Sequence, residues 1–175
     1  MDIKQQEGFP LFSKEDLPLD FDAAADLLKK FLAHLRETDR DDREGLKKAL
    51  KKADDTGEWS KNLFKTILKQ DEKALSLIAE EVNLDSKVIQ FLGRAALTPS
   101  IYALRDALSA NIEADGWDYG YCPLCGSQPN MAYFSKTGRR YLHCELCGEE
   151  WAFSRIRCPF CDNREQETLG YFEAE

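Results

Sequence analysis

Three closely spaced cysteine pairs place the strongest restriction on how this chain folds. All six cysteines lie between residues 122 and 161, and two residues separate the members of each pair. A C-x-x-C turn can point both sulfurs at one centre, and in a reducing compartment such pairs are typical of metal sites rather than disulfides. We therefore expect a metal-binding module in a protein of the cytoplasm. The candidate metal ligands are Cys122, Cys125, Cys144, Cys147, Cys158 and Cys161.

The first two pairs have the spacing of a zinc ribbon. Eighteen residues separate Cys125 from Cys144, and two strands over residues 131–134 and 140–143 would bring the pairs together as a hairpin. Gly126 and Gly148 follow the pairs and can adopt the positive φ that each turn needs. The sequence predicts one zinc or iron ion held by four thiolates. Such a site has no open position for water or a substrate, which argues against metal hydrolysis, so we expect a structural role, or electron transfer if iron binds.

The third pair, Cys158 and Cys161, supplies only two thiolates. We expect it to begin a second, incomplete ribbon, with Asn163 in the turn position of glycine, and its metal binding then depends on ligands beyond the given sequence. The alternative in which Cys144 and Cys147 pair with it is less favoured. Only ten residues lie between those two pairs, which leaves little length for a hairpin.

Two other interpretations of the cysteines are also less favoured. His143 could replace its neighbour Cys144 as a ligand, but a position on the face of a hairpin is the commoner one for such a histidine. A thioredoxin-like dithiol would need a C-x-x-C pair at the start of a helix beside a βαβ pattern, and this hairpin-like region offers none.

The chain before the cysteines shows helical periodicity. We expect a helix that begins at Asp20, a second that ends at Gly57, and others over residues 59–68, 75–82 and 86–96. Thr98 and Pro99 predict the start of a separate last helix, which Asp115 and Gly116 end. The predicted fold class is α+β: an all-α domain over residues 1–116, a rubredoxin-like or zinc-ribbon module over 117–155, and half of a second ribbon over 156–175.

The charge and hydropathy of the chain argue against nucleic acids and membranes as partners. The chain carries a net charge of -8 and has a pI near 4.9, so it repels phosphate backbones and we expect no nucleic-acid partner. No run reaches the roughly 20 apolar residues of a membrane span, and the charged N-terminus has no apolar core of a secretory signal.

The cysteine-containing part resembles the formate dehydrogenase accessory protein family, FdhE. The resemblance covers residues 117–171, whereas the helical part matches only in general character. The family pattern has four C-x-x-C pairs, of which this sequence has three. The residues that carry the resemblance are Trp117, Gly120, the run 122–127 (CPLCGS), Pro129, the run 138–144 (GRRYLHC), Cys147, Trp151, Arg155 and Cys158.

This resemblance implies a cytoplasmic maturation protein that turns over no substrate. Its partner would be the molybdenum- or tungsten-dependent catalytic subunit of formate dehydrogenase, which needs the accessory protein for activity. The chemistry of four thiolates leaves a second interpretation open, a redox-active rubredoxin-like iron protein that delivers electrons to its client. A third, a zinc-ribbon protein that binds nucleic acid, is disfavoured by the negative charge.

Overall fold

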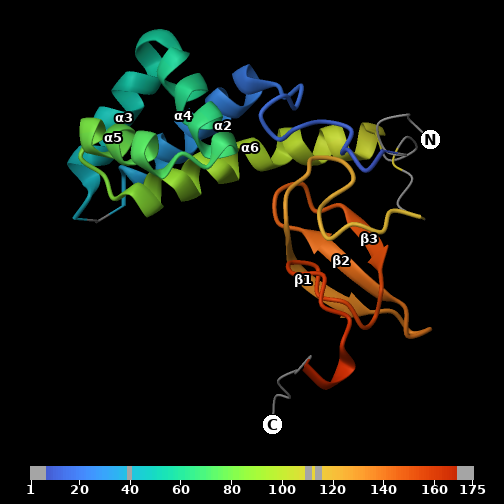
Figure 1. Ribbon diagram of the computed structural model, residues 1–175. Coiled ribbons are helices and arrows are strands. Elements are labelled where there is room, and N and C mark those ends of the chain that lie inside the picture. The colour runs from blue at the N-terminus through green and yellow to red at the C-terminus, as the bar shows by residue number, and fades with distance from the viewer. Residues whose placement is uncertain (1–6, 39–40, 109–111, 113–115, 169–175) are drawn as a thin grey trace. The chain divides into compact units, whose positions relative to one another are not determined.

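The computed structural model describes residues 7–38, 41–108, 112 and 116–168, in which helices precede a small sheet (Figure 1). The chain divides into two compact units, one formed by Pro18–Leu104 and the other by Met1–Leu17 with Arg105–Glu175. The first unit is helical and the second contains all three strands. This arrangement confirms the predicted α+β class, whereas the predicted boundary near residue 116 stays a prediction.

The helical unit contains the helices that the periodicity predicts. They are α2 (Phe21–Leu35), α3 (Arg43–Thr56), α4 (Glu58–Lys69), α5 (Glu72–Val82) and the beginning of α6 (Ser86–Leu108). The Asp20 carboxylate accepts hydrogen bonds from the backbone N–H groups of Asp22 and Ala23, so the predicted cap of α2 is confirmed. Gly57 lies between α3 and α4 with a φ of 65°, a left-handed conformation that glycine adopts without strain.

The predicted break at Thr98 is wrong, because α6 continues through Pro99. Proline inside a helix costs about 3 kcal/mol, since it removes one hydrogen bond and crowds the preceding turn. The buried face, however, runs on from Leu97 to Ile101, and a full break would take these side chains off one stripe. Burying each is worth about 1.5–3 kcal/mol, which offsets the proline. The predicted end at Asp115 lies outside the described residues.

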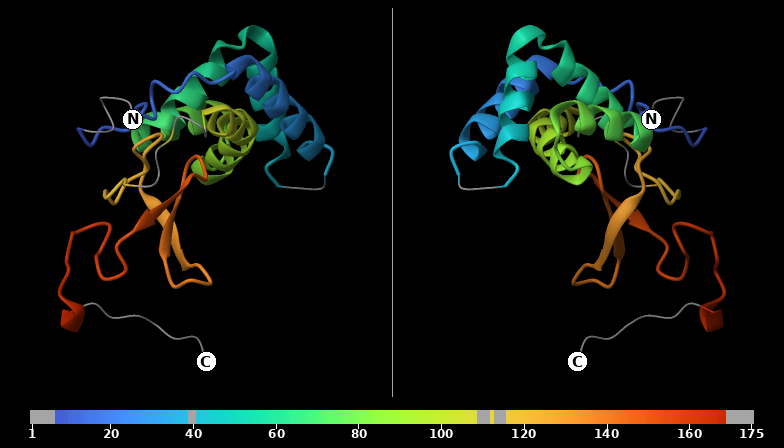
Figure 2. Two further views of the ribbon diagram at one scale, coloured as in Figure 1. Left: turned by 90° about the vertical axis from the view of Figure 1, so that its right-hand side faces the viewer. Right: turned by 90° about the vertical axis from the view of Figure 1, so that its left-hand side faces the viewer.

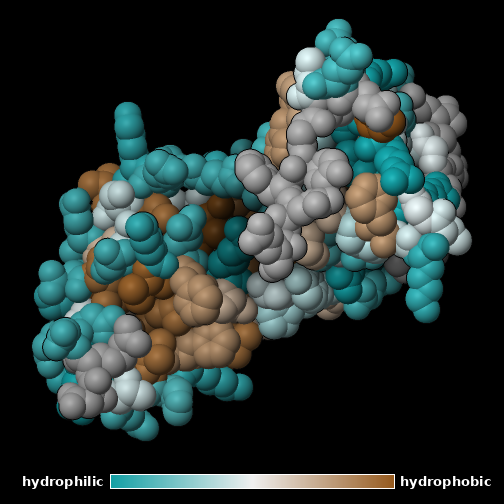
Figure 3. Space-filling view, turned by 90° about the horizontal axis from the view of Figure 1, so that it is seen from below, coloured by the Kyte–Doolittle hydropathy of each residue, from teal (hydrophilic) through white to brown (hydrophobic). Residues whose placement is uncertain are grey.

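A separate apolar core stabilises the helical unit. Leu32, Leu63 and Phe64 are fully buried. Gly93 lets α6 approach α4 closely, because a Cβ there would lie 2.4 Å from Cδ1 of Ile67. The unit also carries apolar surface outside its core, since apolar side chains gather on one of its faces (Figure 3). Among the described residues, no helix combines the length and apolar character that crossing a membrane requires.

The second unit contains an antiparallel sheet in the order β1-β2-β3 (Figure 2). Its strands are β1 (Pro129–Phe134), β2 (Arg140–Cys144) and β3 (Glu150–Phe153), followed by the 3₁₀ helix η2 (Gln166–Thr168). The predicted hairpin of β1 and β2 is confirmed, and β3 was not predicted. Leu142 lies opposite Trp151, and both are buried. Packing of this pair adds the third strand to the hairpin. The chain end from Leu169 lies outside the described residues.

Candidate metal centre

The first two cysteine pairs form turns with the same backbone geometry. The Gly126 N–H donates to the Cys122 carbonyl at 3.0 Å, and the Gly148 N–H donates to the Cys144 carbonyl at 3.2 Å. Both glycines have a φ of 70°, the left-handed conformation that the sequence predicts for them. Each turn therefore points two sulfurs in one direction, and the β1–β2 hairpin brings the two turns together.

The four thiols of these turns form one buried cluster. Their sulfurs all lie within 4.8 Å of one another. The Sγ of Cys125 is 3.5 Å from that of Cys144 and 3.7 Å from that of Cys147, and the Cys122 and Cys147 sulfurs are 3.5 Å apart. A tetrahedral zinc site with Zn–S bonds of about 2.3 Å has sulfurs about 3.8 Å apart. The cluster therefore fits one metal ion.

Mutual contacts and burial shift the acidity of these thiols in opposite directions. Burial raises the pKa of Cys122 well above its usual value. Hydrogen bonds from the thiols of Cys122, Cys144 and Cys147 lower the pKa of Cys125. The cluster by itself favours one thiolate that accepts hydrogen bonds from its neighbours, because several thiolates this close would repel one another strongly. A divalent cation at the centre would allow all four to ionise.

Neighbouring groups orient the second turn. Backbone N–H groups of Leu146 and Cys147 lie 3.4 and 3.5 Å from the Cys144 sulfur, where they stabilise negative charge on it. The Arg105 guanidinium, near the end of α6, donates to the carbonyls of Cys147 and Gly148 at 3.4 Å. Sequence reasoning did not predict this arginine contact, because it joins residues 42 and 43 positions apart.

A segment near the N-terminus lies along the first turn. Leu11 and Phe12 donate backbone hydrogen bonds of 2.9 Å to the carbonyls of Pro123 and Leu124. The Tyr121 hydroxyl donates to the Gly8 carbonyl at 2.5 Å. Sequence reasoning missed this segment as well. The only signal was the short apolar run at residues 8–12 (GFPLF) in an otherwise charged stretch.

The third pair also forms a turn of this kind. Asp162 donates to the Cys158 carbonyl at 3.1 Å, and Cys158 donates to the Asn163 carbonyl at 2.8 Å. Asp162 has a φ of 61°, so it occupies the position of Gly126 and Gly148. The prediction that Asn163 takes this role is wrong. Aspartate tolerates the left-handed region better than most residues, and its carboxylate here pairs with the Arg157 guanidinium.

The six cysteines therefore separate into a cluster and a pair. Within the described residues, Cys158 and Cys161 are not part of the metal-competent group. Cys161 is exposed and Cys158 is half-buried, and backbone N–H groups of Cys161 and Phe160 lower the pKa of Cys158. The alternative that joins this pair to Cys144 and Cys147 is wrong, because those two thiols face Cys122 and Cys125.

His143 does not belong to the cluster either. Its Nδ1 lies 3.1 Å from the Asn130 side-chain oxygen, and it is opposite Met131 in the β1–β2 register. It takes the position on a hairpin face that the sequence favoured. The aromatic side chains near the cluster serve packing: the Trp117 and Trp151 indoles donate to the carbonyls of Tyr121 and Tyr119 at 2.7 and 3.0 Å.

The fold and the cluster define a helical protein with a zinc-ribbon-like module of four cysteines. The family model "FdhE, central domain" matches residues 121–155. A "Protein FdhE homolog" of Aquifex aeolicus is 31% identical over 109 residues, which are 59% of this chain and 38% of that protein. "Protein FdhE" of Salmonella choleraesuis is 45% identical over 58 residues, or 31% of this chain and 18% of that one. The chain is therefore similar to FdhE proteins, most specifically over the segment that matches the family's central domain.

The crystal structure of the FdhE protein from Pseudomonas aeruginosa has the same fold. It superimposes with a TM-score of 0.65 at 24% identity, and the match covers 98% of this chain and 55% of the crystallised one. The present chain therefore spans about half the length of that protein, and its matches to the two curated relatives cover still smaller parts of theirs.

Proposed function

We propose that this protein is an accessory protein of the cytoplasm that binds the catalytic subunit of formate dehydrogenase and is needed for the activity of that enzyme. The observation that carries the proposal is the buried cluster of four thiols inside the segment that matches the FdhE central domain. Similarity to the FdhE family suggests the client. The cluster supplies a reason for a preformed binding surface.

We further propose that Cys122, Cys125, Cys144 and Cys147 hold one zinc or iron ion as a structural centre. Four thiolates leave no coordination position for a substrate, so this metal would not hydrolyse anything. In small peptides a structural zinc site contributes about 10–16 kcal/mol to folding. A module over residues 117–155 has a small apolar core, so the metal would dominate its stability.

We propose a separate role for the third cysteine pair, which lies outside the four-thiol cluster. Cys158 and Cys161 form a correctly shaped turn that would supply two ligands of a second metal site, at the start of a second ribbon over residues 156–175. Its remaining ligands would come from outside the described residues. Metal quantification checks this part: about one ion per chain fits the first site alone, and two ions fit both.

A capture experiment tests the client. The metal-loaded protein, immobilised through a tag, is mixed with its cognate formate dehydrogenase catalytic subunit. A second sample carries serine at all four cluster positions, and Cys161→Ser serves as a control that alters an exposed thiol outside the cluster. We expect capture by the loaded protein and loss of capture by the fourfold variant. If the loaded protein captures no subunit, the proposal that the catalytic subunit is the client is refuted. If the fourfold variant captures it fully, the proposal that binding needs the cluster is refuted.

The same geometry favours one second candidate, a redox-active iron protein that delivers electrons to the client. Four thiolates bind iron as well as zinc. An iron-loaded protein with visible absorption that bleaches on reduction and returns on exposure to the client would support this function. A colourless zinc protein that fully restores formate dehydrogenase activity would contradict it.

A further inference from the structure

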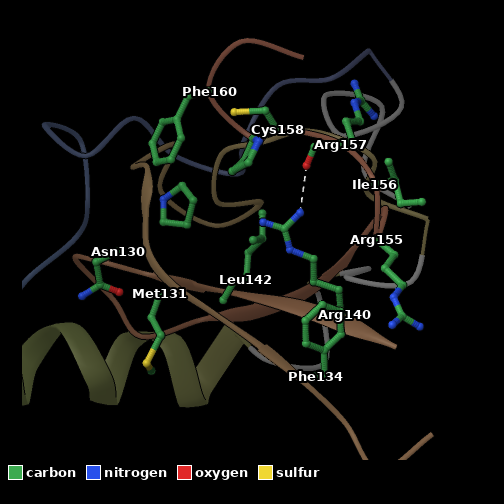
Figure 4. A pocket seen from close by; sticks show the side chains of 13 residues that line it. Asn130, Met131, Phe134, Arg140, Leu142, Arg155, Ile156, Arg157, Cys158 and Phe160 are labelled. Atoms are coloured by element: carbon green, nitrogen blue, oxygen red, sulfur yellow. Dashed lines mark hydrogen bonds between the residues drawn. The ribbon is translucent and has the colours of Figure 1, made fainter. Parts of the chain in front are cut away.

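A groove of about 910 Å³ lies over one face of the sheet in the second unit (Figure 4). Ala132 lies opposite Leu142, and Phe134 lies opposite Arg140, so these four side chains share the face that forms its floor. Residues 155–160 form the opposite wall. The face of the sheet that a helix or a second sheet layer would ordinarily cover is open along this groove.

The groove exposes large apolar side chains from both sides. Phe134 on the floor is 57% exposed, and Ile156 and Phe160 on the wall are 43% and 64% exposed. Single exposed apolar residues are common on protein surfaces, but several that converge on one concavity indicate a contact site. Their burial by a partner would supply the hydrophobic part of a binding energy.

The groove is also cationic, although the chain as a whole has a net charge of -8. Its lining includes three arginines and no acidic side chain. Arg157 is paired with Asp118 at 2.7 Å, whereas the described residues provide no ion pair for Arg140 or Arg155. Arg140 donates to the Arg157 carbonyl at 2.8 Å, and Arg155 lies 5.2 Å from the ring centroid of Phe134. Two positive charges therefore remain for a ligand.

The adjoining strand β1 offers a backbone edge. It is an outer strand of the sheet, and all its residues after Pro129 are exposed. An outer strand presents unpaired N–H and C=O groups within the described part of the chain, and an extended peptide can add to such an edge as a further strand. Alternate side chains of that peptide would then point toward the groove.

Contacts with the segment that contains Asp118 and Gly120 fix the position of the groove wall. A Cβ at Gly120 would lie 1.9 Å from the carbonyl oxygen of Pro159, so the third turn packs directly on the backbone there. The Arg157 guanidinium also donates to the Asp118 carbonyl at 3.1 Å. A preformed wall costs a ligand little ordering energy.

We propose that this groove binds an extended segment of a partner protein in which every second side chain faces the groove, and apolar and acidic residues alternate among these groove-facing positions. The apolar side chains pack against Phe134 and Phe160, and the carboxylates pair with Arg140 and Arg155. The inference rests on the proposed function in one respect: the segment belongs to the client subunit. A nucleic acid is disfavoured as the occupant because the surrounding protein is acidic and repels phosphates.

A fluorescence anisotropy titration tests the groove directly. The probe is a labelled peptide of about eight residues, the length of a strand, with valine and glutamate alternating at every second position and serine at the positions between them. Its control has lysine in place of glutamate. Arg155→Glu and Phe160→Ser each lower the affinity of the full chain for the glutamate peptide about tenfold, because each removes a central contact of the groove.

Two matched variants separate the groove from general surface effects. Arg139→Glu makes the same charge change beside β2, but Arg139 lies over the Tyr141 ring at 5.6 Å, and neither residue lines the groove. Phe91→Ser removes an equally exposed phenyl ring, 70% exposed, from the helical unit. Both leave the affinity within about twofold.

Several results would overturn the proposal. They are equal binding of the glutamate and lysine peptides, equal losses in the groove and control variants, and a dimer whose formation excludes the peptide. A chain that ends at Thr168 and binds the peptide more tightly than the full chain would also overturn it, since residues 169–175 would then be the occupant.

The client assay distinguishes the two proposals. If Arg155→Glu captures the catalytic subunit as well as the unaltered protein does, the groove is not the docking site and the proposed function stands. If the unaltered protein captures no subunit but binds the glutamate peptide selectively, the proposed function fails and the groove remains a peptide site.

Discussion

Replacing one cysteine of the cluster should release the metal and unfold one unit of the protein selectively. Cys144→Ser removes one of four sulfurs that lie within 4.8 Å of one another. A structural zinc site is worth about 10–16 kcal/mol, so one of four equivalent thiolates accounts for roughly 2.5–4 kcal/mol. That corresponds to a zinc affinity about 100- to 1,000-fold lower. Competition with a chromophoric zinc chelator measures this change.

Metal loss should affect only the second unit, because the helical unit has an apolar core of its own. The sheet of the second unit has few large buried side chains besides the cysteines, among them Leu142 and Trp151, whereas the helical unit buries Leu32, Leu63 and Phe64 in a core of its own. Loss of metal should therefore abolish hydrogen-exchange protection at the amides of β2 and leave that of α4 unchanged.

Cys161→Ser is the control for this prediction, and two results would contradict it. Cys161→Ser alters an exposed thiol outside the cluster and should leave zinc affinity at the first site unchanged. Unaltered zinc affinity in Cys144→Ser would show that the cluster is not the binding site. Simultaneous loss of protection in β2 and α4 would show that the helical unit depends on the metal, contrary to the reasoning from separate cores.

Three further predictions concern stability. Gly120→Ala should destabilise the second unit by about 1–3 kcal/mol in urea unfolding, because the Pro159 carbonyl, 1.9 Å from the new Cβ, has to move; unchanged stability would contradict this contact. Pro99→Ala should stabilise the protein by about 2 kcal/mol, since it restores a helical N–H in the exposed middle of α6; a loss of stability would show that the proline is needed there. A hydrogen bond from Lys52 lowers the pKa of Glu81, so the pair stabilises the fold at neutral pH and loses this effect as the carboxylate is protonated in acid. Glu81→Gln should accordingly reduce the fall in the urea midpoint between pH 5 and pH 3, compared with the same change at Glu80 on the exposed side of α5; identical profiles would refute the pairing.

The features that sequence reasoning predicted correctly depend on local spacing. The apolar stripes before residue 83 recur at helical intervals, and the cap of α2 lies directly beside the N–H groups that it satisfies. The four-thiol cluster was predictable for a similar reason. Two short turns and one hairpin suffice to bring Cys122 and Cys144 together, and the residues that form those turns are adjacent in the chain.

The features that were missed or wrong depend on contacts between distant residues. Pro99 signals a break by itself, and only the buried face of α6 shows why the helix continues. The Tyr121 hydroxyl meets the Gly8 carbonyl across 113 positions. The groove likewise requires residues 155–160 to fold back over β1. Local patterns thus identified the helices and the four-thiol cluster, because their geometry repeats within a few residues. Only tertiary packing determined the continuous helix, the segment along the first turn and the arginine-lined groove, because their energies come from side chains that chain order does not place together.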